Sequence, residues 1–186
     1  MNLAKIVASG LVGVGLAGIL QVADASQTTK KETPAYQQQY SQVPSRLTIP
    51  SIGVNARVEQ VGVTSSGEMG LPSSAWTVAW YNLGTAPGEY GNSVIAGHLD
   101  SRSGPAVFWS LRRLQYGDQV NVYSGDNQMT FEVQAVESYN YYNAPLQEIF
   151  GWVPDRNLNL ITCNGTFDRS SANYNQRLVV YTRLIE

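Results

Sequence analysis

Cysteine and histidine are nearly absent from this chain of 186 residues, which holds one of each, Cys163 and His98. One cysteine excludes an intramolecular disulfide framework and excludes zinc sites built from several cysteines. Lysine and arginine form no run, and the net charge is −2, which argues against a nucleic-acid partner. No acidic cluster suggests a calcium site, so we predict no required metal and no cofactor.

The first residues are far more apolar than the rest. After Lys5, residues 6–22 are apolar apart from Ser9 and Gln21, and Ala23-Asp24-Ala25 fits the small-x-small pattern of a signal-peptidase site. The run falls short of the roughly 20 residues that span a bilayer. Residues 1–25 are therefore interpreted as a signal peptide that is removed or as a retained membrane anchor. Both interpretations place the remaining chain outside the cytoplasm.

Residues 26–45 are rich in Gln, Thr, Ser, Tyr and Pro and show no apolar periodicity. Such a segment has little to bury, so we predict a flexible linker. We assign residues 46–186 to one folded domain, a length that can bury a full core.

Short alternating strands and frequent turns dominate residues 46–186. Sparse helix with many turns favours a mainly β fold, either a closed barrel rich in antiparallel pairs or a sandwich. A short helix is expected at 105–114, where Phe108, Leu111 and Leu114 recur every three residues, and one helical turn at 145–150. Strands are expected at 47–50, 54–58, 76–81, 92–99, 119–123, 129–136, 158–163 and 177–184, and the strands 119–123 and 129–136 are expected to form a hairpin around residues 125–127.

The last two expected strands suggest where the single cysteine points. Side chains alternate between the two faces of a strand. If the apolar faces containing Leu160 and Val180 point to the core, Thr162 also points inward. Cys163 and Arg177 then both point outward. A cysteine on the outer face at a strand end is less typical of a structural residue, so a reactive thiol and a buried small side chain remain as alternatives.

A reactive thiol needs a proton partner and a group that stabilises negative charge. His98 is the only imidazole and can activate a thiolate or protonate a leaving amine. Arg177 can stabilise the oxyanion of a tetrahedral intermediate. A hydrogen-bonded loop histidine and a solvated surface arginine are the alternatives for these two residues when each is considered alone.

The domain resembles the sortases from Arg46 to Glu186. The motifs are Leu47-Thr-Ile-Pro-Ser-Ile-Gly-Val54, Gly91-Asn-Ser-Val-Ile-Ala-Gly-His98, Leu160-Ile-Thr-Cys163 and Gln176-Arg-Leu-Val-Val-Tyr181, and their order and spacing match the family. Gly97-His-Leu-Asp100 followed by Pro105-Ala-Val-Phe-Trp109 is most similar to class E or class F. Many sortases have Thr-Leu-x-Thr-Cys before the nucleophile, whereas this chain has Asn159 at the first position.

This resemblance implies a closed eight-stranded barrel with one or two short helices and a transpeptidation by a cysteine peptidase. Cys163 would attack the Thr carbonyl of a Leu-Pro-x-Thr-Gly-like sorting signal on a secreted protein. His98 would protonate the departing amine, and Arg177 would hold the oxyanion. An amine of the cell wall or of a pilin would then resolve the thioester. The family resemblance also favours a retained membrane anchor and a place at the cell surface.

Further residues have weaker assignments. Thr162, Ile161 and Val179 are predicted to bind substrate, and the aromatic-rich segment 139–152 is predicted either to wall the groove or to pack in the core. Asp100 either orients His98 or forms a turn. Asp168 and Arg169 either shape the groove mouth or form a surface ion pair.

Two other functions remain open at this point. A cysteine hydrolase would use the same three residues with water as the acceptor. A non-enzymatic surface module would bind glycans or proteins through exposed Tyr and Trp, and would not need Cys163.

Overall fold

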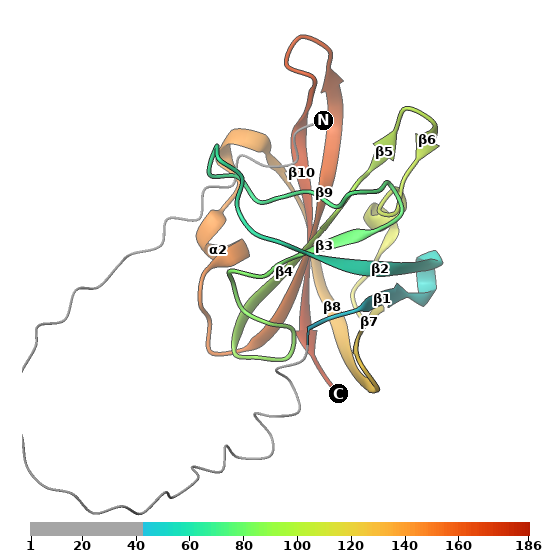
Figure 1. Ribbon diagram of the computed structural model, residues 1–186, viewed down its shortest axis with the longest axis vertical. Coiled ribbons are helices and arrows are strands. Elements are labelled where there is room, and N and C mark those ends of the chain that lie inside the picture. The colour runs from blue at the N-terminus through green and yellow to red at the C-terminus, as the bar shows by residue number, and fades with distance from the viewer. Residues whose placement is uncertain (1–42) are drawn as a thin grey trace, which may run out of the picture.

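A closed barrel forms the body of the protein, with strands in the order β1-β2-β3-β4-β9-β10-β8-β7 (Figure 1). The structure, a computed structural model, describes residues 43–186. The predicted signal or anchor segment, and the linker up to residue 42, lie outside the described residues. The barrel strands are β1 (Arg46–Ile49), β2 (Val54–Val61), β3 (Val78–Tyr81), β4 (Gly91–Gly97), β7 (Gln119–Ser124), β8 (Asn127–Asn140), β9 (Arg156–Asp168) and β10 (Asn173–Leu184).

The predicted mainly β, eight-stranded closed barrel is confirmed. Most neighbouring strands pair antiparallel, but β2 pairs parallel with β3, and β4 pairs parallel with β9. The hairpin predicted around residues 125–127 joins β7 to β8. The small elements are η1 (Pro50–Ile52), the hairpin β5 (Asp100–Ser101) and β6 (Gly104–Pro105), η2 (Leu111–Arg113), η3 (Tyr141–Asn143) and α2 (Leu146–Phe150).

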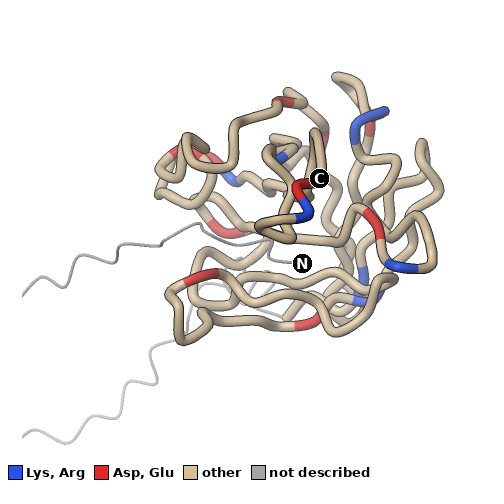
Figure 2. The backbone as a smooth tube through the Cα atoms, turned by 90° about the horizontal axis from the view of Figure 1, so that it is seen from above, with Lys and Arg blue, Asp and Glu red and all other residues tan. Residues whose placement is uncertain are grey.

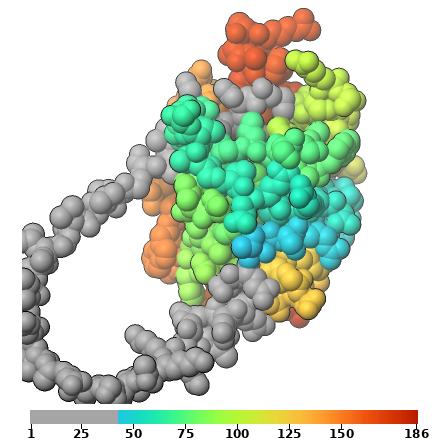
Figure 3. All heavy atoms as spheres, in the orientation of Figure 1, coloured from blue at the N-terminus to red at the C-terminus, as the bar shows by residue number. Residues whose placement is uncertain are grey.

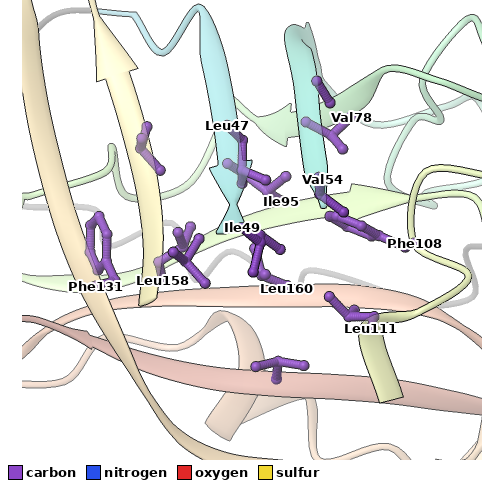
Figure 4. Packing of buried hydrophobic residues seen from close by; sticks show 14 of the residues in the cluster. Leu47, Ile49, Val54, Val78, Ile95, Phe108, Leu111, Phe131, Leu158 and Leu160 are labelled. Carbon is purple, nitrogen blue, oxygen red and sulfur yellow. The ribbon is translucent and has the colours of Figure 1, made fainter. Parts of the chain in front are cut away.

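The barrel interior holds one apolar cluster built from alternate residues of the strands (Figure 4). Along β9 the inward residues are Leu158 and Leu160, and along β10 they are Leu178 and Val180. Phe131 and Phe108 are fully buried in the same cluster. Burying this apolar area is the main stabilising term for a fold with so little helix.

A second apolar cluster lies on the outer face of β3, β4, β9 and β10. Its strand members are the residues that alternate with the interior set, such as Ala96 of β4 and Ile161 of β9. Met69 from the β2–β3 connection and Ile149 from α2 pack into it. The face opposite the barrel core is therefore also covered at these strands, in contrast to an ordinary solvent-facing strand.

The helix predicted over residues 105–114 is wrong. Pro105 belongs to β6, and only Leu111–Arg113 form a single 3-10 turn. The backbone N–H groups of Ala106, Val107 and Phe108 donate to the carbonyls of Leu99, Ala75 and His98, at 3.0, 2.9 and 2.9 Å. These donors are satisfied by carbonyls that lie outside the segment, in the loops before β3 and after β4, so no α-helical ladder forms there. The three-residue spacing of the buried side chains fits a 3-10 turn equally well.

Charged residues are sparse and are scattered along the backbone (Figure 2). The structure has two ion pairs among residues 43–186, Arg57–Glu59 at 3.3 Å and Arg183–Asp155 at 3.7 Å. Within the same residues no helix has the length and apolar character needed to cross a membrane.

Candidate active site

The strands β4, β9 and β10 are neighbours in the barrel; Cys163 lies in β9, Arg177 lies in β10, and His98 directly follows the last residue of β4. Cys163 and Arg177 are direct partners in the antiparallel β9–β10 register. The parallel β4–β9 register pairs Ala96 with Ile161, and the residues two further along are His98 and Cys163. The pairing thus places Cys163 directly beside Arg177, and it places His98 just beyond the end of the strand that pairs with β9.

The three side chains also share a face. Ala96, Ile161, Cys163 and Val179 all belong to the outer cluster, and His98 alternates with Gly97 just as Ala96 does. Gly97 faces the interior, where a Cβ would lie 2.5 Å from Cδ2 of Phe108. A glycine is required there, and the close packing of Phe108 fixes the strand end that carries the imidazole.

The outward parity predicted for Cys163 agrees with the structure, but outward does not mean exposed. The Cys163 side chain is fully buried in the outer cluster. Both faces of the sheet are packed at these strands, so a structural cysteine is compatible with the outer face as well. Burial raises the pKa of the thiol, while the Arg177 cation lowers that pKa and the Asp100 carboxylate raises it.

Arg177 is fully buried and is fixed by several contacts. Its Nη1 donates to the carbonyls of Tyr174 and Gln176 at 3.1 and 2.8 Å, and Nη2 donates to Oδ1 of Asn173 at 2.9 Å. The guanidinium also lies over the ring of Tyr141, with Cζ 4.4 Å from the ring centroid. Burial lowers its pKa, and the nearby thiol raises it. These contacts hold the planar guanidinium in a fixed orientation.

His98 is half-buried at the end of β4. Its Nε2 donates to the carbonyl of Pro72 at 3.3 Å, which fixes the ring against the β2–β3 connection. Its Nδ1 is buried and has no hydrogen-bond partner among residues 43–186. Because Nε2 is the donor to Pro72, Nδ1 is the basic nitrogen of the neutral ring.

Asp100 does not hydrogen-bond to His98. Its Oδ2 accepts a 2.5 Å hydrogen bond from the hydroxyl of Tyr174, at the start of β10. Burial and this bond raise the pKa of Tyr174 to about 12, so the phenol is a stable donor at neutral pH. The pair links the segment that follows His98 to the strand that carries Arg177.

The predicted substrate-binding residues lie at the site but are fully or nearly fully buried. Ile161 and Val179 are 2% and 0% exposed and form part of the outer cluster. Thr162 faces the interior, and its hydroxyl donates to the carbonyl of Gly97 at 2.8 Å, tying β9 to β4. This hydrogen bond gives Thr162 a structural role, and its role in binding substrate remains a prediction.

Two connections cover the outer cluster. The β2–β3 connection contributes Met69 and Leu71, and segment 139–152 contributes Tyr139, Ile149 and Phe150. The same segment leaves Tyr142 and Trp152 exposed at 81% and 69%. Packing and exposed aromatic surface are thus both present in the segment predicted to wall the groove.

The loop after β9 makes local contacts. The carboxylate of Asp168 accepts hydrogen bonds from the hydroxyls of Ser170 and Ser171 at distances from 2.7 to 2.9 Å. These bonds lower its pKa and close the β9–β10 turn. No ion pair joins Asp168 and Arg169 within the described part of the chain.

Sequence reasoning missed three residues that hold Arg177: Tyr141, Asn173 and Tyr174. The β9–β10 register shifts between Tyr174 and Gln176. This irregularity turns the Tyr174 carbonyl toward the guanidinium while its phenol reaches Asp100. Strict strand alternation would have separated these groups, so the sequence carried no signal for them.

No group of three or more His, Cys, Asp or Glu side chains suited to a metal ion occurs within residues 43–186.

Comparison with known families gives one match over most of the chain. The family model described as "Sortase domain" matches residues 47–185. No curated protein sequence matches the chain.

Solved structures with the same fold include three enzymes of low sequence identity. Sortase A from Listeria monocytogenes is 18% identical with a TM-score of 0.60, covering 78% of this chain and 88% of that chain. Sortase C-1 from Actinomyces oris is 21% identical with a TM-score of 0.60, covering 86% and 84%. A lid mutant of sortase A from Corynebacterium diphtheriae is 18% identical with a TM-score of 0.61, covering 87% and 83%.

Proposed function

The chain belongs to the sortase family, and from that premise we propose that it is a cysteine transpeptidase with Cys163, His98 and Arg177 as its catalytic residues. The observation that supports the proposal is the β9–β10 register, which pairs Cys163 with Arg177, next to the end of β4, after which His98 follows directly. A thiol, an imidazole and a fixed guanidinium at this end of the sheet supply a nucleophile, a proton carrier and an oxyanion partner. The class E or class F assignment remains a prediction from the sequence.

In the first half-reaction, the thiolate of Cys163 attacks the Thr carbonyl of a Leu-Pro-x-Thr-Gly-like signal on a secreted protein. Negative charge develops on the carbonyl oxygen, and the Arg177 guanidinium stabilises it. His98 gives a proton to the departing Gly amine, and the C–N bond breaks. A thioester remains on Cys163, and it retains the acyl energy without ATP.

In the second half-reaction, an amine of the cell wall or of a pilin attacks the thioester carbon. His98 accepts the amine proton, the C–S bond breaks, and the thiolate is restored. The packed outer cluster limits water near the sulfur, which favours transfer over hydrolysis. Since Cys163 is fully buried, side chains that cover this cluster must shift for the substrate carbonyl to reach it. Ile161, Val179 and Thr162 would then border the bound peptide.

The test uses the full chain, sorting-signal peptides of varied sequence, and amines such as triglycinamide. We expect a mass adduct on Cys163 and a transfer product that depends on the amine. Cys163→Ala should give neither adduct nor cleavage while its circular dichroism spectrum and thermal midpoint stay close to those of the parent. His98→Ala and Arg177→Ala should each form far less product.

Each failure has a separate meaning. Cleavage retained in Cys163→Ala would exclude the transpeptidase proposal. Cleavage that depends on Cys163 but responds to no amine tried would favour a cysteine hydrolase. Binding of a surface ligand that is indifferent to Cys163 would favour a non-enzymatic module.

A further inference from the structure

A cavity of about 440 Å³ opens beside the candidate site, between the β5–β6 hairpin and the β9–β10 hairpin. These two hairpins stand at the same end of the molecule (Figure 3). The cavity is lined by Asp100, Ser101, Arg102, Phe167, Ala172 and Tyr174.

Its inner wall is the hydrogen-bonded pair of Asp100 and Tyr174. Asp100 follows His98 by two residues, and the carbonyl of Tyr174 accepts a hydrogen bond from Arg177. Both Asp100 and Tyr174 interact electrostatically with the Cys163 thiol. The cavity therefore borders the candidate site on the side of the segment that carries the imidazole.

The position of His98 limits where an acceptor can enter. The group that protonates the leaving amine is the group that deprotonates the incoming amine, because the two half-reactions are the reverse of each other in proton transfer. The acceptor nitrogen must thus reach the thioester past His98. The cavity lies against the segment that follows His98, since Asp100 lines it.

We propose that this cavity binds the acceptor amine, with the Asp100 carboxylate as its counter-ion and Tyr174 as the residue that positions that carboxylate. The inference rests on the proposed transpeptidase function and specifies where its second substrate binds.

The lining groups suit a primary amine. An ionised carboxylate accepts at both oxygens, and Tyr174 uses Oδ2 of Asp100. The rings of Phe167 and Tyr174 pack edge to face at 5.2 Å, and Phe167 is 42% exposed, so aromatic surface is available to an ammonium group. Arg102 is exposed, where water screens its charge.

Protons and bonds balance when the acyl group passes from Cys163 to the acceptor amine. The bound ammonium loses one proton to solvent and becomes a neutral amine. Its nitrogen then attacks the thioester carbon, a second proton passes from nitrogen to neutral His98, and the C–S bond breaks to release the thiolate. The products are an amide, the Cys163 thiolate and protonated His98, and no oxidant or reductant is involved.

The test separates the acceptor step from thioester formation, using the full chain with triglycinamide and n-butylamine as acceptors. We expect Asp100→Asn to raise the amine concentration for half-maximal transfer about tenfold, the scale of one charge-assisted hydrogen bond. Because the Asp100 charge also acts on the Cys163 thiol, the amine dependence is measured as the ratio of transfer to hydrolysis from the thioester, which does not depend on how fast the thioester forms. Quenched-flow mass spectrometry should still detect the thioester in Asp100→Asn. Tyr174→Phe should raise the half-maximal concentration by a smaller factor, because the carboxylate remains but is no longer fixed.

Asp168→Asn is the matched control, since this carboxylate lies on the β9–β10 hairpin, which carries Phe167 and Tyr174, but does not line the cavity. It should leave the half-maximal amine concentration unchanged. If Asp100→Asn forms the thioester and keeps the parental half-maximal concentration for both amines, the inference is wrong while the proposed function stands. If the parent chain forms no thioester with any peptide, both are wrong. Nuclear magnetic resonance titration of Cys163→Ala with triglycinamide gives an independent reading: shifts should centre on residues 100–102 and 172–174, and shifts elsewhere alone would overturn the inference.

Discussion

The guanidinium of Arg177 is buried and is held in one orientation by its neighbours. A buried cation costs free energy unless it is hydrogen-bonded. Here two backbone carbonyls and the amide oxygen of Asn173 supply the acceptors, and the ring of Tyr141 covers one face. The planar fork of arginine matches this set, and a lysine ammonium does not.

We therefore expect Arg177→Lys to lower kcat/KM for peptide cleavage at least about 100-fold, because removal of one oxyanion donor has that effect in comparable sites. Peptide cleavage followed by chromatography measures it. Arg183→Lys is the matched control on the same strand, with an exposed side chain, and it should stay within about twofold of the parent. Parental activity in Arg177→Lys would show that a positive charge suffices and that the fork is not required.

The groups around the Cys163 thiol affect its pKa, and this leads to a measurable prediction. Burial raises the pKa of Cys163, Arg177 opposes this, and Asp100 adds to it, while Tyr174 is another titratable group that interacts with the thiol. Because the thiolate reacts, alkylation by iodoacetamide should rise about tenfold per pH unit between about pH 6 and 8. Arg177→Gln should slow alkylation at every pH in this window, since it removes the cation that lowers the pKa. A rate that is flat from about pH 6 upward would show a thiolate already formed and would contradict this prediction.

At the scale of elements, asparagine side chains attach the α2 segment to the barrel. Asn92 of β4 donates to the carbonyls of Glu148 and Gly151, both at 2.9 Å, and its Oδ1 accepts from Asn157 at 3.0 Å. Asn159 of β9 donates to the carbonyl of Ile149 at 2.7 Å. Asn159 is the residue that departs from the usual sortase motif, and this bond gives the departure a structural purpose.

Loss of one of these asparagines should loosen the segment. Asn92→Ala leaves two carbonyls and one amide without a partner, so we expect it to lower the free energy of unfolding by about 2–3 kcal/mol. Urea denaturation followed by circular dichroism measures the change. Asn55→Ala, at an exposed position of β2, should cost less than about 0.5 kcal/mol. Equal costs for the two variants would mean that the asparagine contacts to α2 contribute little.

For the whole molecule, the two faces of β4, β9 and β10 have different tasks. The inner face fills the barrel, and the outer face holds the candidate site together with the segments that cover it. A one-residue change of register would exchange the two faces, so the closed barrel fixes both at once. The candidate site is thereby fixed by the same pairing that builds the core.

A large-to-small change inside the barrel should accordingly affect the entire fold. Leu160 is fully buried, and Leu160→Ala should lower the free energy of unfolding by about 2–5 kcal/mol. Leu83→Ala, at a side chain that is 63% exposed, serves as the control and should stay within about 0.5 kcal/mol of the parent. Far-ultraviolet and near-ultraviolet circular dichroism should show one common unfolding midpoint for Leu160→Ala. A midpoint that matches that of Leu83→Ala would show that this layer is not part of the cooperative core.

Local pattern predicted most of the strands and the side of the sheet that Cys163 and Arg177 occupy. It failed at residues 105–114, where the backbone donors bond to distant carbonyls. It also failed to show that the outer face is buried, because the covering residues Met69 and Ile149 come from segments far away in the chain. Asp100 could not be assigned from sequence either, since its partner Tyr174 is 74 residues away.

The sequence by itself determined the alternation of faces, the mainly β composition and the motifs around His98, Cys163 and Arg177. These follow from side-chain type and from the two-residue period of a strand, which are local properties. Only the tertiary structure decided which strands are neighbours, what covers the thiol and which acceptors hold the guanidinium. Such choices depend on contacts between distant segments, and their energies exist only once the barrel has closed.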